Sequence, residues 1–286
     1  MSVLSQMIRE HKKGKSLLAP DVERFFPEIV LSPNPKIGVV IGTYAAVPYV
    51  VLQLEARKLY WPEVAVLVHD DSSQCQEELR AVCQQYGADF VSTPYRLAAT
   101  VGDMSAFMAG LNWGKENDLD IIVKLSRRYI LYHNWVPGLQ KLSYNTQYAT
   151  YGNSCVYYDY PLRSECIGMN VAVWHASRAV GELRQIVSTN IPPPEIMEKW
   201  YHALCCQIHM EYAPTAVRKY EKLFLRHPRA GGFGIWHMMG YSRHSRVPGI
   251  LWDDIHSPLD YWLMADSWGL KNYKLEDFED PNMGQA

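Results

Sequence analysis

The chain has 286 residues, of which 48% are hydrophobic, and a formal net charge of -2 at pH 7. This length supports a substantial core, and the charge balance excludes a general electrostatic attraction to nucleic acid or an anionic membrane. The six cysteines lack both a paired metal-binding spacing and the density of a disulfide-stapled secreted domain. We therefore expect reduced thiols, a cytoplasmic location and no membrane span, since no apolar run reaches 18 residues.

Strands and helices are expected to alternate through the first half of the chain. Apolar, β-branched runs with the length of strands occupy 36–43, 63–69, 89–92 and 120–125. Apolar residues at helical spacing fill the intervals at 48–61, 79–86 and 103–116, with Pro48 opening the first helix and Gly87 ending the second. Such alternation predicts a parallel sheet with right-handed crossovers.

Ligands of parallel α/β sheets bind at the carboxyl ends of the strands. In this sequence those ends carry Thr43 and Tyr44, then His69, Asp70 and Asp71, then Thr93, and finally Ser126, Arg127 and Arg128. We expect these side chains to meet at one edge of the sheet.

Beyond residue 145 the pattern changes. Aromatic, extended segments are predicted at 148–160 and 166–174, followed by helices near 176–188 and 195–212. Residues 215–250 carry seven Lys or Arg and one Glu, a balance of +6, whereas 251–286 carry two Lys and eight acids, a balance of -6. We divide the chain into a peripheral segment 1–35, a core 36–212, and a C-terminal part 213–286 with a basic stretch, a helix and an acidic tail.

The first two strand ends read I-G-T-Y and V-H-D-D-S-S. Together with the helix that feeds the fourth strand, they resemble the GT-A glycosyltransferases, particularly the family-2-like group, over residues 36–130. The resemblance implies an α/β, Rossmann-like, mostly parallel sheet flanked by helices, with an acceptor-side C-terminal extension. It also implies that Thr43 and Tyr44 hold the nucleotide and that Asp70 or Asp71 contacts its base or ribose.

The residue types agree with that role on physical grounds. A carboxylate at a strand end can accept hydrogen bonds from a pyrimidine N–H or a ribose hydroxyl, and a neighbouring aromatic ring can stack on the base. The alternative is that Asp70, Asp71 and the two following serines cap the next helix.

The end of the fourth strand departs from the family. Metal-dependent members carry an acidic D-x-D triplet there, whereas this chain reads Lys124-Leu-Ser126-Arg127-Arg128. Hard cations need oxygen ligands, and guanidiniums bind phosphate directly. We therefore predict a metal-independent site without a cofactor, in which Arg127 or Arg128, with Lys124, holds the diphosphate.

A second group of cations lies in the Gly-rich stretch 226–246. Many GT-A enzymes close a C-terminal loop over the diphosphate, and a Gly-rich stretch with several cations suits such a loop. The resemblance does not fix which residue makes the contact; we take His237, Arg243 and Arg246 as the candidates. Alternatively, the stretch is a basic patch that meets the acidic tail of this chain or an anionic acceptor such as DNA.

An inverting transferase needs a carboxylate to take the acceptor proton. The family position near the start of a helix after the acceptor-side strands corresponds to Glu195 and Glu198. Acidic residues are also favoured in a first helical turn without any catalytic role. Asp159 is a further candidate, and so are Asp253 and Asp254, although those two also suit a turn before a helix that starts at 257–258.

The leading hypothesis is a metal-independent glycosyltransferase that moves a sugar from a nucleoside diphosphate donor, a UDP-sugar, to a hydroxyl group of a glycan or another acceptor. Two alternatives stay open: an inactive GT-A-fold binding protein, and a glycosyltransferase that acts on modified nucleic acid bases.

Overall fold

A computed structural model gives the architecture of part of the chain. The described residues are 32–97, 99–140, 150–152, 165–177, 249–252 and 256–279. No helix within these ranges is both long and apolar enough to cross a membrane.

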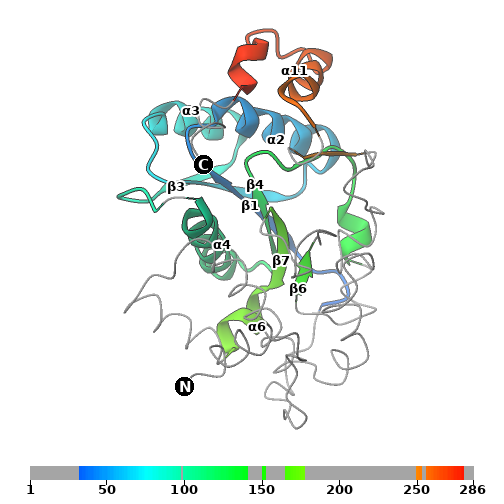
Figure 1. Cartoon of the computed structure of the whole chain (residues 1–286). Helices are drawn as coiled ribbons and strands as arrows, with labels where there is room; N and C mark the ends of the chain where they lie inside the picture. The colour runs from blue at the N-terminus through cyan, green and yellow to red at the C-terminus, as the bar shows by residue number, and fades with distance from the viewer. Residues whose placement is uncertain are drawn as a thin grey trace, which may run out of the picture.

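A six-stranded sheet lies at the centre of the described part (Figure 1). Its strands are β1 (Ile37–Thr43), β2 (Ala65–Asp70), β3 (Asp89–Ser92), β4 (Ile121–Ser126), β6 (Thr150–Gly152) and β7 (Cys166–Asn170). The order is β3-β2-β1-β4-β7-β6. The first four strands are mutually parallel, and β7 runs antiparallel to both β4 and β6. The predicted α/β, mostly parallel sheet is confirmed.

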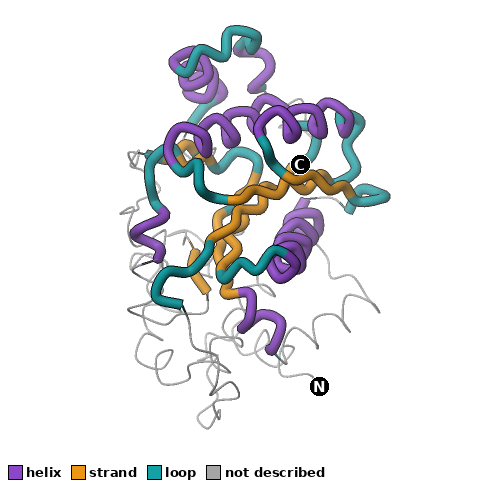
Figure 2. Tube along the Cα trace, turned by 180° about the vertical axis from the view of Figure 1, so that it is seen from behind, coloured by secondary structure: helices purple, strands orange, loops and turns teal. Residues whose placement is uncertain are grey.

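Helices cover both faces of this sheet, as Figures 1 and 2 show from opposite sides. The helices α2 (Val47–Tyr60) and α3 (Gln76–Tyr86) cover one face, and α4 (Ala99–Glu116) covers the other. The core against α2 and α3 contains alternate β1 residues, Val39 and Ile41, whereas Val40 faces α4. Strands β1, β2 and β4 are buried on both faces, which explains their nearly continuous apolar sequences, whereas β3 is partly exposed.

Local sequence signals account for the helix ends on the α2 and α3 face. Pro48 lies in the first turn of α2, where its missing N–H costs no hydrogen bond. Gly87 ends α3 with a left-handed φ of 64°, a conformation that a glycine adopts without a steric penalty. Both ends lie where the sequence predicts them.

Helix α4 approaches the sheet closely because it carries glycines on its inner face. A Cβ at Gly110 would lie 2.5 Å from Cγ1 of Val40 and 3.2 Å from Cγ2 of Ile122. The helix begins at Ala99 rather than at the predicted Asp103, so the sequence pattern missed its first turn.

One predicted segment is wrong in part. Residues 166–174 were expected to be extended, but β7 ends at Asn170 and the helix α6 (Val171–Ala176) follows at once. The Oδ1 atom of Asn170 accepts a hydrogen bond of 3.0 Å from the backbone N–H of Val173, which fixes the helix start. The segment is apolar enough for a strand, but the capping hydrogen bond of Asn170 stabilises a helix from Val171 onward.

The described C-terminal residues pack against the outer side of α2 (Figure 1). They form the short strand β8 (Ile250–Leu251), which pairs with β5 (Ile130–Leu131), then the helix α11 (Pro258–Ser267) and the 3-10 helix η2 (Leu275–Phe278). Tyr49 of α2 makes edge-to-face contacts with Tyr261 and Phe278, at centroid distances of 5.0 and 5.4 Å. Its hydroxyl also donates to the carbonyl of Phe278. As predicted, α11 starts after Ser257.

Candidate functional site

The carboxyl ends of the four parallel strands meet at one edge of the sheet, as predicted. Thr43 pairs with Asp70 across β1 and β2, and Asp70 pairs with Ser92 across β2 and β3. On the other side of β1, Gly42 pairs with Ser126 of β4. The loops that follow these strands therefore share one surface.

Tyr44 lies at the centre of this edge and contacts two arginines. An Nη1–H of Arg127 donates to the Tyr44 carbonyl at 2.7 Å, which joins the loop after β1 to the loop after β4. The guanidinium of Arg96, in the loop after β3, lies over the Tyr44 ring, 3.9 Å from its centroid. Tyr44 is half-buried and Arg96 is exposed. The sequence analysis missed Arg96, because only the fold brings residue 96 next to residue 44.

Asp70 is fully buried at the end of β2. Its Oδ2 atom accepts hydrogen bonds from the backbone N–H of Ser73 at 2.8 Å and from the hydroxyl of Ser92 at 3.1 Å. The helix-capping alternative is wrong for this residue, because α3 has Cys75 as its N-cap and no side-chain capping bond. Asp70 instead closes the turn that precedes α3.

Asp71 holds the loop that carries Arg96. Its Oδ1 atom accepts hydrogen bonds from the Thr93 hydroxyl at 3.3 Å and from the backbone N–H of Leu97 at 2.9 Å. A Cβ at Gly102 would lie 2.7 Å from Oδ2 of Asp71, so the first turn of α4 needs a glycine beside this carboxylate. A direct contact of Asp70 or Asp71 with a nucleotide stays a prediction.

The three cations predicted to hold a diphosphate have different surroundings. Lys124 faces α4, is 1% exposed, and forms an ion pair of 2.5 Å with Asp103. Arg128 is buried toward α2, where its guanidinium lies 5.4 Å from the centroid of the Tyr49 ring. Of the three, Arg127 is the one that the structure brings to Tyr44. None of these contacts tests a role in binding phosphate, which stays a prediction.

His69, the polar residue before Asp70 at the end of β2, is buried. It points toward α4, where its Nε2 atom lies 3.4 Å from the Ser105 hydroxyl. Burial lowers the pKa of His69 despite the nearby negative charges of Asp71, Asp70 and Asp103. The imidazole is therefore neutral at physiological pH.

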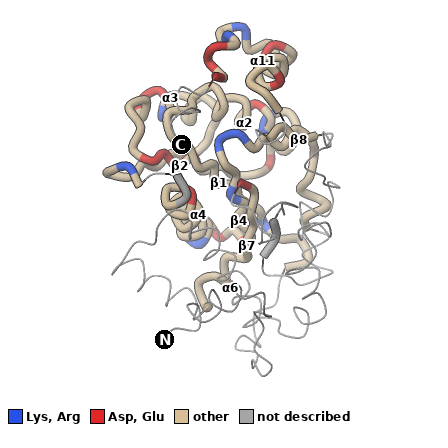
Figure 3. Tube along the Cα trace, viewed as in Figure 1, with Lys and Arg blue, Asp and Glu red and all other residues tan. Residues whose placement is uncertain are grey.

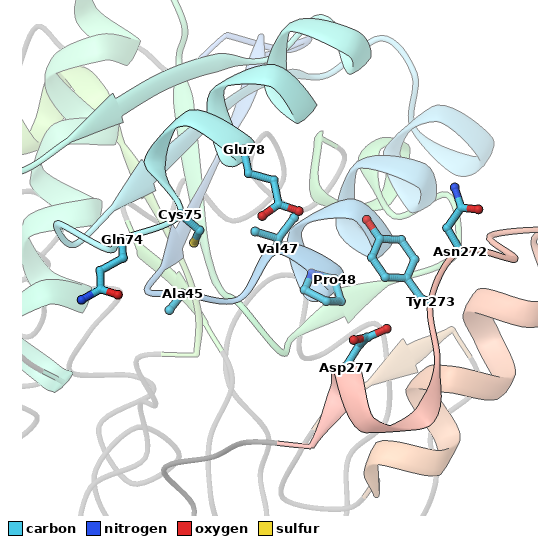
Figure 4. A pocket seen from close by; sticks show the side chains of 9 residues that line it. All are labelled: Ala45, Val47, Pro48, Gln74, Cys75, Glu78, Asn272, Tyr273 and Asp277. Atoms are coloured by element: carbon cyan, nitrogen blue, oxygen red, sulfur yellow. The ribbon is translucent and has the colours of Figure 1, made fainter.

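An open cavity of about 580 Å³ lies beside the edge, between the first turns of α2 and α3 and the C-terminal segment (Figure 4). Its lining residues are Ala45, Val47, Pro48, Gln74, Cys75, Glu78, Asn272, Tyr273 and Asp277. Burial and the charges of Glu78 and Asp277 raise the pKa of Tyr273. These two carboxylates make the cavity unfavourable for an anionic group such as phosphate.

Several predicted site residues lie outside the described ranges. They are Asp159, Glu195, Glu198, His237, Arg243 and Arg246, together with Asp253 and Asp254. In the described part, Lys and Arg positions are interspersed with Asp and Glu around α3 and α11 (Figure 3). A nucleic acid partner is therefore still suggested solely by the basic stretch 226–246.

The side chains at the end of β4 do not suit a hard divalent cation. Arg127 and Arg128 supply guanidiniums, and Ser126 a hydroxyl, where such a cation would need carboxylate oxygens. Within the described ranges, no three His, Cys, Asp or Glu side chains form a group that could hold a metal ion. Asp70 and Asp71 lie at the end of β2, which β1 separates from β4, and both carboxylates accept hydrogen bonds from the loops there.

No protein-family model and no curated protein matches the sequence. Among solved structures, the described fold is similar to a cytidylyltransferase from Leptospira borgpetersenii, at 17% identity and a TM-score of 0.37 over 57% of this chain and 71% of that chain. It is also similar to the mannosyltransferase PcManGT from Pyrobaculum calidifontis in complex with GDP-Man and Mn2+, at 13% identity and a TM-score of 0.37 over 60% of this chain and 53% of that chain. A third is S. aureus TarS 1-349 in complex with UDP, at 11% identity and a TM-score of 0.42 over 62% of this chain and 55% of that chain. The chain thus spans about half the length of two of these proteins. At these TM-scores the likenesses carry no argument about function.

Proposed function

We propose that the chain is a glycosyltransferase that binds a nucleoside diphosphate sugar, a UDP-sugar, at the carboxyl edge of its sheet and transfers the sugar to a hydroxyl acceptor. The observation that carries this proposal is the position of Tyr44 between two guanidiniums, with Arg96 over its ring and Arg127 on its carbonyl. An aromatic plane can bind a base, and guanidiniums bind phosphate. Parallel α/β sheets bind their ligands at this edge.

Arg127 suits the diphosphate role because its position is already fixed. A guanidinium presents its N–H donors in a rigid planar fork that matches the oxygens of a phosphate, and one N–H of Arg127 already donates to the Tyr44 carbonyl. The developing negative charge on a leaving nucleoside diphosphate would be stabilised by a cation that needs little reorganisation. We therefore propose that arginine, without a divalent metal, performs this step.

The acceptor must lose a proton as its oxygen attacks the anomeric carbon. Glu198 is the proposed base, with Glu195 and Asp159 as the other candidates. His237, Arg243 and Arg246 of the 226–246 stretch are proposed to contact the diphosphate.

A thermal-shift panel of nucleotide sugars, each measured with Mn²⁺ and with EDTA, tests the proposed donor. Stabilisation of the full chain by a UDP-sugar in EDTA is expected, because a ligand that binds the native state alone raises its stability. No response to any nucleoside diphosphate would refute the proposal, and a response that requires Mn²⁺ would refute the arginine-based mechanism. Release of UDP from the stabilising donor then separates a transferase from a protein that only binds.

A further inference from the structure

One face of the Tyr44 ring is covered in this structure, because the guanidinium of Arg96 lies over it, 3.9 Å from its centroid. Two stacked planes are separated by about 3.5 Å, so a base that lies between them needs about twice that spacing. Arg96 must therefore move outward by about one ring thickness before a base can enter.

The side chain of Arg96 extends from a loop that is exposed to solvent between two anchored residues. This loop is tied down by Asp71, which accepts from the Thr93 hydroxyl and from the backbone N–H of Leu97. Between these two anchors, Tyr95 is 66% exposed and Arg96 is exposed as well. The loop is thus fixed at both ends and open to solvent at its tip.

We propose that Tyr44 and Arg96 form a clamp for the nucleobase, in which the base stacks on the Tyr44 ring and Arg96 closes over its other face. This inference rests on the proposed function, since it concerns the same edge. Arg96 is a specificity-determining residue in the clamp, and Asp71 is a positioning residue that acts through the loop at 93–97. A guanidinium is planar and stacks on an aromatic face, whereas the ammonium of a lysine would keep the charge and lose the plane.

The clamp predicts that Arg96 contributes to binding of the base and not of the diphosphate. The affinity of UDP is measured by calorimetry in EDTA, and that of inorganic pyrophosphate by competition against UDP. Arg96→Ala and Arg96→Lys are each expected to weaken UDP about tenfold and to leave pyrophosphate unchanged, because a stacking contact on one face of a base is lost.

Arg80→Ala is the matched control. Arg80 also stacks on an aromatic ring, that of Phe90 at 4.9 Å, but from α3 and away from Tyr44. This variant is expected to bind UDP like the wild type. A loss of UDP affinity equal to that of Arg96→Ala would show that the effect is not specific to the clamp.

Any result for Arg96→Ala other than weaker UDP binding with unchanged pyrophosphate affinity would refute the clamp. Tighter UDP binding would show that Arg96 competes with the base for Tyr44, and an equal loss for pyrophosphate would show that Arg96 contacts the phosphates. Unchanged UDP affinity would show that Arg96 has no role. If wild-type protein binds no nucleoside diphosphate at all, the proposed function fails first, so the two failures are distinguishable.

Thr93→Val tests the positioning role of Asp71, because it removes one hydrogen-bond donor to that carboxylate and keeps the side-chain shape. A modest loss of UDP affinity is expected in the wild-type background and none in the Arg96→Ala background. Equal losses in both backgrounds would show that Asp71 does not act through Arg96.

Discussion

The ion pair between Lys124 and Asp103 is expected to respond unequally to the loss of each partner. The Lys124 side chain is 1% exposed and that of Asp103 is 24% exposed. Removing one partner of a buried pair costs about 3 to 5 kcal/mol, because the other charge is left buried and unpaired. Asp103→Asn leaves the ammonium fully buried and is expected to cost about 3 kcal/mol. Lys124→Met leaves a carboxylate that water can reach, and is expected to cost about 1 to 2 kcal/mol.

Urea unfolding of the two single variants and of the double variant measures these free energies. The double variant is expected to be more stable than Asp103→Asn alone, since neither charge remains. Asp118→Asn is the control: Asp118 forms an equally short pair with Lys36, at 2.6 Å, but both side chains are exposed, and no measurable change is expected. Small, equal losses in both single variants would refute the reasoning. They would show that the Lys124 ammonium is solvated and thus available to a ligand.

Three further outcomes follow from buried contacts. Gly110→Ala gains helix propensity of about 1 kcal/mol, but its Cβ would lie 2.5 Å from Val40 Cγ1, so we expect net destabilisation of about 1 to 2 kcal/mol in the same unfolding assay. Burial lowers the pKa of His69 in the folded state, so the unfolded state binds the proton more tightly. The free energy of unfolding should therefore keep its full value above pH 6.5, the ordinary pKa of His, and decrease as the pH drops below that value. The His69→Gln variant should show a smaller decrease over the same pH range. Tyr44→Ala should weaken UDP binding about tenfold in calorimetry at an unchanged unfolding midpoint, because the half-buried ring is proposed to contact the base.

The sequence predicts the layout of the edge because its signals are local. Buried β-branched runs define β1, β2 and β4, and the parallel order then places Thr43, Asp70 and Ser126 at one edge. Gly87 and Pro48 mark helix ends through their own backbone preferences. These inferences need no knowledge of tertiary contacts.

The side-chain roles at the edge could not be predicted in this way. Asp71 is tied to a loop more than 20 residues away, and Arg96 reaches Tyr44 across two strands of the sheet. The sequence predicts Lys124 as an accessible cation at a strand end. In the structure, the alternation of side chains along β4 directs Lys124 toward α4, where it pairs with Asp103. Such pairings depend on register and helix placement, which a single sequence does not encode locally.

Calorimetric titration of UDP in EDTA into the wild type and into Arg127→Gln tests the central claim most directly. Binding by the wild type without metal, and a loss of about tenfold or more in the variant, is the expected result, because one charge-assisted contact to phosphate is removed. Absence of binding in EDTA with recovery in Mn²⁺, or equal affinity of the two proteins, would contradict the claim that an arginine beside Tyr44 holds the diphosphate.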